Sequence, residues 1–100
     1  MIYCFDIDGT LCSITDGQYI DAEPFSERIR VVNDLYDKGN QIFLYTARGS
    51  QTGIDWENLT RNQLAEWGVK YHRLSLGKPH YDVWIDDKAI SDQNFFKVKR

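Results

Sequence analysis

The chain has 100 residues, a length that suits one small domain with a single core. Hydrophobic residues make up 42% of it and aromatic residues 14%, which is enough apolar surface to exclude an intrinsically disordered chain. The formal net charge of −3 disfavours nucleic acid and anionic membranes as partners, because both attract basic proteins.

The two cysteines, Cys4 and Cys12, are too few for a disulfide framework and fit a reduced setting. Cys4 lies in an apolar stretch, where we expect it to pack as a small hydrophobic residue. An aspartate follows as early as Asp6, so no signal peptide is expected, and no apolar run is long enough to span a membrane. We therefore expect a cytoplasmic protein.

Short apolar runs alternate with helical periodicity along the chain. We expect strands at residues 2–5, 41–45, 69–74 and 81–85, and helices at residues 24–38 and 56–67. Residues 11–23 are polar and irregular and predict a flap, and residues 49–55 predict a loop. The tail from Ile90 to Val98 is compatible with a short helix or an edge strand.

This order of elements predicts a single α/β domain with a small, mostly parallel sheet flanked by helices. Right-handed crossovers leave few topologies, and we expect the strand order 3-2-1-4. The first and fourth strands then lie side by side. Their carboxyl ends meet at the edge of the sheet where open α/β folds bind ligands.

Pairs of acidic residues follow both of these strands. Asp6 and Asp8 come after the first strand, and Asp86 and Asp87 after the fourth. Four carboxylates in one cleft repel one another unless a divalent cation joins them. The residues alone therefore predict a hard-metal site with a nucleophilic carboxylate, and the Gly9-Thr10 turn lets backbone approach a ligand closely.

These motifs resemble those of the haloacid dehalogenase-like (HAD) superfamily of phosphohydrolases. The run from Phe5 to Leu11 resembles the first motif, DxDGT, and the strand ending in Thr46 resembles the second. Lys78 resembles the lysine of the third motif, and the strand ending in Asp86-Asp87 resembles the fourth. The resemblance covers nearly the whole chain and implies a Rossmann-like, three-layer fold.

The resemblance also implies a role for each catalytic candidate. Asp6 would attack phosphorus and form an aspartyl-phosphate. Asp8 would protonate the leaving alcohol and then deprotonate the attacking water. Thr46 would hydrogen-bond a phosphoryl oxygen, and Lys78 would offset negative charge on the nucleophile and the phosphate.

Magnesium is the cofactor that the resemblance implies. Its protein ligands would be the Asp6 carboxylate, the Asp8 backbone carbonyl and Asp86, with Asp87 binding directly or through a metal-bound water.

The chain leaves no room for the cap domain that many members of the superfamily insert, so we expect a capless enzyme. An open cleft suits a large substrate or needs a neighbouring subunit to exclude water, and a homo-oligomer that completes the site is therefore expected as one arrangement. The flap with Tyr19 and the loop at residues 49–55 are the expected substrate-choosing elements. The runs Thr46-Ala47-Arg48-Gly49 and 67–72 resemble small bacterial members linked to capsule or surface-polysaccharide biosynthesis, which implies a small-molecule sugar phosphate as substrate.

Several residues keep two interpretations. Arg48 either holds a second anionic group of the substrate or pairs with nearby carboxylates, and Gly9 and Thr10 are further candidate substrate contacts. His72 is expected to be structural and His80 exposed. The three tryptophans are expected in the core, with contact to substrate as the alternative for Trp56.

Two other functions stay open. The run 46–67 also resembles part of capless polynucleotide 3′-phosphatase domains, although the acidic balance disfavours a nucleic-acid substrate. The third possibility is a non-enzymatic module that binds metal or phosphate. Such a module has no chemical need for both Asp6 and Asp8.

Overall fold

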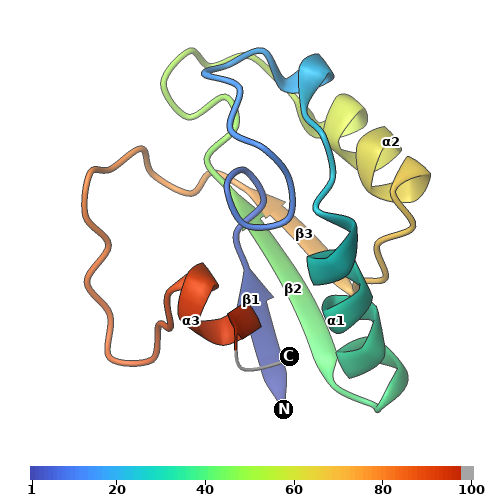
Figure 1. Ribbon diagram of the computed structural model, residues 1–100. Helices are drawn as coiled ribbons and strands as arrows, with labels where there is room; N and C mark the ends of the chain where they lie inside the picture. Colours follow the sequence, from blue (N-terminus) through green and yellow to red (C-terminus); the bar gives the residue numbers. More distant parts are fainter. Residues whose placement is uncertain (98–100) are drawn as a thin grey trace.

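The computed structural model describes residues 1–97, which form a small α/β domain (Figure 1). In chain order the elements are β1 (Ile2–Phe5), the short 3-10 helix η1 (Tyr19–Asp21), α1 (Ser26–Asp37), β2 (Gln41–Thr46), α2 (Glu57–Glu66), β3 (Arg73–Leu76) and α3 (Asp92–Lys97). None of these described helices is long and apolar enough to cross a membrane.

The sheet has three parallel strands in the order β1-β2-β3. Phe5 stands beside Leu44, and Thr46 beside Leu76, so the carboxyl ends of the strands lie along one edge. In Figure 1 the flap and the loop after β2 both lie beyond this edge. The prediction of a parallel α/β sheet is thus confirmed for three strands.

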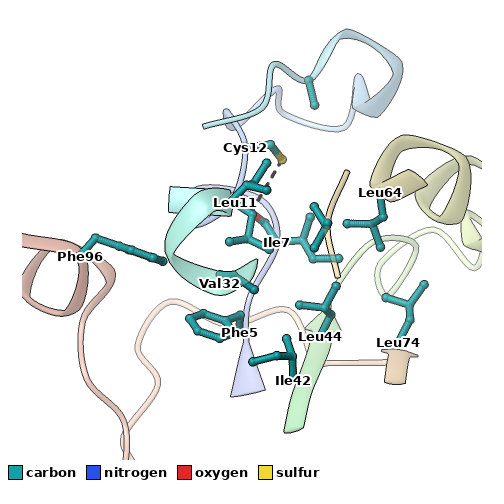
Figure 2. Packing of buried hydrophobic residues seen from close by; sticks show 13 residues of the cluster. Phe5, Ile7, Leu11, Cys12, Val32, Ile42, Leu44, Leu64, Leu74 and Phe96 are labelled. Atoms are coloured by element: carbon teal, nitrogen blue, oxygen red, sulfur yellow. Dashed lines mark hydrogen bonds between the residues drawn. The ribbon is translucent and has the colours of Figure 1, made fainter. Parts of the chain in front are cut away.

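The hydrophobic core lies on one face of this sheet, where all three α-helices pack (Figure 2). Ile42 and Leu44 of β2 are fully buried there. The helices contribute Val32 from α1, Leu64 from α2 and Phe96 from α3. Their apolar spacing along the chain places these side chains on the inner helix faces.

The opposite face of the sheet is not covered in the same way, which corrects the prediction of a three-layer fold. Cys4, Phe43 and Arg73 lie side by side across the strands, and they are exposed, half-buried and exposed. The Arg73 guanidinium lies over the Phe43 ring at 4.6 Å. Ile2 is 61% exposed. The first strand is therefore buried on one face only, and Cys4 does not pack in the core.

The prediction of a fourth strand at residues 81–85 is wrong for this conformation. These residues have no regular secondary structure, and Val83 and Ile85 are 73% and 92% exposed. Only residues 77–80 separate them from β3, whereas a crossover between parallel strands needs a dozen residues or more. The apolar pattern favoured a strand, but the connection is too short for the expected place beside β1.

Two smaller boundaries also differ. The third strand begins at Arg73 rather than at residue 69, because Val69 is buried under α2 and the Leu64 carbonyl accepts its N–H. The tail forms the helix α3, where Phe95 and Phe96 pack against Tyr3 and Phe5. Val98, at the end of the expected tail element, lies outside the described residues.

Candidate active site

A cleft of about 690 Å³ opens at the carboxyl ends of β1 and β2. Three segments surround it: the flap after β1, the loop after β2 and the residues that follow β3. The predicted site residues that line it are Asp6, Asp8, Arg48 and Lys78. His80, Tyr19 and Trp56 line it as well.

A tight turn after β1 sets the two aspartates. The fully buried Ile7 accepts backbone hydrogen bonds from Thr10, Leu11 and Cys12 through its carbonyl oxygen. Gly9 adopts a φ of +85°, a conformation that L side chains rarely take. The turn holds Asp6 and Asp8 just beyond the carboxyl end of β1, with Ile7 pointing into the core between them.

Asp6 accepts two hydrogen bonds from within the chain. Lys78 Nζ lies 3.3 Å from one carboxylate oxygen and Thr10 Oγ1 lies 3.2 Å from the other. Burial raises the pKa of Asp6, and the positive charge and hydrogen bond of Lys78 only partly oppose this effect. The carboxylate is therefore less stabilised as an anion than an exposed aspartate, which suits a nucleophile.

Lys78 reaches Asp6 because the backbone after β3 is fixed at two points. Its N–H donates to the Thr46 carbonyl at 3.1 Å, and its own carbonyl accepts from the Ser50 hydroxyl. The ammonium lies 5.1 Å from the Tyr81 ring centre and 5.3 Å from that of Trp84. Burial by itself lowers the pKa of Lys78, but Tyr81 and Asp6 outweigh it and the pKa is raised overall. Lys78 is thus a held positive charge beside Asp6.

Asp8 forms a two-point ion pair with Arg48. The guanidinium donates from Nε and Nη2 to the two carboxylate oxygens, each at 2.9 Å. The Arg48 side chain is fully buried, and that of Asp8 is 21% exposed. Both carboxylate oxygens of Asp8 therefore accept a hydrogen bond from Arg48 in this conformation.

The remaining donors of Arg48 are directed at the protein. Its Nη1 donates to Thr60 Oγ1 at 3.1 Å and to Gln63 Oε1 at 2.6 Å, and its guanidinium carbon lies 4.7 Å from the Tyr19 ring centre. Of the two interpretations of Arg48, this conformation shows the pairing with a carboxylate. Thr60 and Gln63, both buried on α2, were not among the predicted site residues. A buried arginine needs several acceptors, and its partners are not readable from spacing alone.

Three other predicted contacts lie behind the cleft rather than on its lining. Thr46 is 1% exposed, and its hydroxyl accepts the Arg48 backbone N–H at 3.1 Å. Gly9 and Thr10 are half-buried, and the Thr10 hydroxyl is turned to Asp6. In this conformation all three support the charged residues rather than face open space.

Aromatic residues form one wall of the cleft. Tyr19 from the flap meets Trp56 edge to face, with ring centres 5.1 Å apart. Trp56 is half-buried and Trp84 is 41% exposed, so the prediction of three core tryptophans is wrong for both. Only Trp67 packs against the core.

Cys12 is a buried structural residue, and His72 has the structural role expected of it. Burial, and then the charge of Asp8, raise the pKa of the Cys12 thiol to about 12, so it stays protonated and unreactive. His72 accepts the Ile42 backbone N–H at 3.0 Å through Nδ1 and stacks on Tyr36.

Asp86 and Asp87 do not join the other acids in this conformation. Both are exposed, neither lines the cleft, and Asp86 accepts the Lys88 backbone N–H. Among residues 1–97, no three His, Cys, Asp or Glu side chains come together in a way that could hold a metal ion. The donors that one copy of the chain gathers at the cleft therefore do not fit a magnesium site by themselves. This corrects the expected convergence of four carboxylates within one chain.

Comparison with known proteins gives one informative result. No family model matches the chain, and no curated protein matches it. The crystal structure of a structural genomics target from Vibrio cholerae is similar over 95% of this chain and 86% of that one, with 25% sequence identity and a TM-score of 0.85. The chain therefore shares its α/β fold with a solved bacterial protein.

Proposed function

We propose that the protein is a phosphomonoester hydrolase in which Asp6 is the nucleophile. The observation that carries the proposal is the Asp6–Lys78 pair: a carboxylate with a raised pKa beside a held ammonium, at the carboxyl end of a parallel strand. The resemblance of the first motif to that of the HAD superfamily supports the same assignment.

Two displacements at phosphorus make up the reaction. First, an Asp6 oxygen bonds to phosphorus as the ester bond breaks, and Asp8 gives the leaving alcohol its proton. Then water attacks the aspartyl-phosphate, Asp8 takes the proton, and free carboxylate and inorganic phosphate result. Lys78 offsets negative charge in both steps.

Magnesium remains the expected cofactor, and it would supply charge neutralisation between Asp6 and the phosphate. Because one chain does not gather enough ligands, no step above depends on it.

A sugar phosphate in surface-polysaccharide synthesis is the substrate class that we propose. The cleft has a volume of about 690 Å³, and Tyr19 and Trp56 give it an aromatic wall against which a sugar ring can pack. The resemblance of residues 46–49 and 67–72 to capsule-biosynthesis members supports this class.

Release of phosphate from an aryl phosphate tests the proposal. We expect Asp6→Asn to reduce kcat/KM by about 10³-fold or more, because loss of a nucleophile removes the covalent route. Asp34→Asn is the matched control, since Asp34 is exposed on α1 and, among residues 1–97, its side chain forms an ion pair with Lys38 alone. Full activity of Asp6→Asn would contradict the proposal.

A substrate panel then separates the alternatives. Faster turnover of sugar phosphates than of a 3′-phosphorylated oligonucleotide supports the proposed class, and the reverse result supports the nucleic-acid alternative. No hydrolysis of any ester by the wild type, in the presence of magnesium, would favour a binding module.

A further inference from the structure

Residues 79–91, called the arm from here on, form an exposed loop that leaves the body of the domain near Lys78 and returns at α3 (Figure 1). Every residue of the arm is exposed. The order of its apolar residues nevertheless suits a strand, because an extended chain would place Val83 and Ile85 on one side and Trp84 on the other. Such a segment has apolar surface to bury if it pairs with a sheet edge.

The strand β1 offers the matching unpaired edge. It is the first strand of the sheet, and within residues 1–97 it pairs with β2 alone. The segment 81–85 would extend the sheet there and bring Asp86 level with Asp6. Only a parallel arrangement does this, because an antiparallel strand would carry Asp86 to the opposite edge of the sheet.

The arm is too short to make this pairing with its own β1. Residues 77–80 connect Leu76, the end of β3, to Tyr81, and these five residue steps extend to about 18 Å at most. The new strand would lie three strand spacings from β3, about 14 Å, and would begin at the far end of the sheet, about 20 Å back along the strand direction. The connection is therefore shorter than a straight line through the sheet, and a path over the side chains is longer still.

We propose that two copies of this chain exchange arms. Residues 81–85 of one copy add a parallel strand to β1 of the other, and Asp86 and Asp87 enter the second copy's cleft beside its Asp6. The two acids that one chain leaves outside its own cleft thus come from a second chain. The part of the proposal that concerns catalysis rests on the proposed function above.

The pairing has a definite register. With Asp86 level with Asp6, Trp84 stands beside Cys4, while Val83 and Ile85 stand beside Tyr3 and Phe5. Tyr3 and Phe5 point to the core face and Cys4 to the open face. The apolar alternation of the arm therefore matches that of β1.

Mixing two inactive variants tests the shared site. Asp6→Asn lacks the nucleophile, and the double variant Asp86→Asn/Asp87→Asn lacks the donated acids. After the two are unfolded and refolded together, we expect about a quarter of the wild-type activity, because half of the dimers are mixed and each of these holds one complete site. Asp6→Asn mixed with Lys78→Met is the matched control. It should recover nothing, because both residues belong to the same copy of the cleft.

No recovery in the first mixture, from variants that are folded and dimeric, would overturn the proposal. Recovery in both mixtures would overturn the assignment of the acids to the exchanged arm.

Disulfide formation detects arm exchange without an activity measurement. Neighbouring strands lie about 5 Å apart, within the Cα separation that a disulfide bridges. We expect oxidised Trp84→Cys to link to Cys4 of the second copy and to run as a covalent dimer of the 11.7 kDa chain. Val83→Cys lies at a more exposed position but would face the other side of the added strand, so it should not link to Cys4.

Sedimentation of the wild type at micromolar concentration completes the test. A monomer, or an oxidised product that stays monomeric, would overturn arm exchange whether or not the protein hydrolyses phosphate esters. A linked dimer that hydrolyses no ester would instead reject the proposed function and keep the exchange.

Discussion

The cleft and the arm both contain charged residues, yet the fold holds them very differently. In the cleft, Arg48 reaches Asp8, Thr60 and Gln63 at 2.6–3.1 Å and is fully buried. In the arm, Asp86 and Asp87 are exposed, and so are the apolar residues before them. The comparison teaches that a single copy fixes the charged residues of the cleft by several contacts and leaves the acids of the arm in solvent. Substitutions in the two regions should therefore have very different effects on one chain.

Loss of the Arg48 guanidinium should be the largest effect on stability. We expect Arg48→Met to lower the free energy of unfolding by about 3–5 kcal/mol, because it leaves Asp8 and Gln63 without their buried partner. Urea unfolding measures this change. Arg30→Met is the control, because Arg30 is exposed on α1. Equal effects of the two substitutions would contradict the claim that the buried contacts of Arg48 stabilise the fold.

The second-largest loss of stability should come from a substitution that makes a side chain collide with the backbone. Gly49 has a φ of +83°, and a Cβ there would collide with the Ile54 carbonyl oxygen. We expect Gly49→Ala to cost about 3 kcal/mol and to lower kcat/KM by displacing the loop that lines the cleft. Gly39→Ala has a similar φ of +94° and open space around it, so strain alone should cost about 1–2 kcal/mol. If Gly49→Ala and Gly39→Ala lower the free energy of unfolding equally, the loop after β2 moves away from the added Cβ at no cost.

The pH dependence of activity should report on the Asp6–Lys78 pair. Asp6 attacks as the anion, so kcat/KM should fall as the pH drops through its pKa, which lies above the ordinary 3.8. Lys78 lowers this pKa against the effect of burial. We therefore expect Lys78→Met to move the acid limb of the kcat/KM profile to higher pH, besides reducing its maximum. If the acid limb does not move, the group that titrates there is not one that the charge of Lys78 affects.

The smallest effect on an isolated chain should come from the arm. Ile85 is 92% exposed, so Ile85→Ser should change the free energy of unfolding by less than about 0.5 kcal/mol in dilute solution. At concentrations where arms exchange, the same substitution should lower the Tm, because it weakens the dimer. Thermal scans over a range of concentrations distinguish the two regimes. A large loss in dilute solution would mean that the arm packs on its own domain.

The sequence was informative wherever local rules decide the structure. Apolar spacing predicted α1, α2 and the first two strands, and the strand-end rule placed Asp6 and Asp8 at the edge where the cleft lies. The place of Lys78 beside Asp6 was expected only from the family resemblance. It was less informative where partners come from a distance. Thr60 and Gln63 are ordinary helix residues until a buried arginine needs their oxygens. The fourth strand failed because its apolar pattern was weighed without the short connection at residues 77–80, although that signal was in the sequence.

Covalent capture at residue 6 tests the central claim most directly. The wild-type protein is mixed with an aryl phosphate, quenched in acid within a turnover and digested, and the position of the phosphoryl group is read by mass spectrometry. We predict an acid-stable, alkali-labile phosphoryl group on Asp6, and none in Asp6→Asn. A phosphoryl group on another residue, or steady hydrolysis with no trapped intermediate and full activity of Asp6→Asn, would contradict the assignment of Asp6 as the nucleophile.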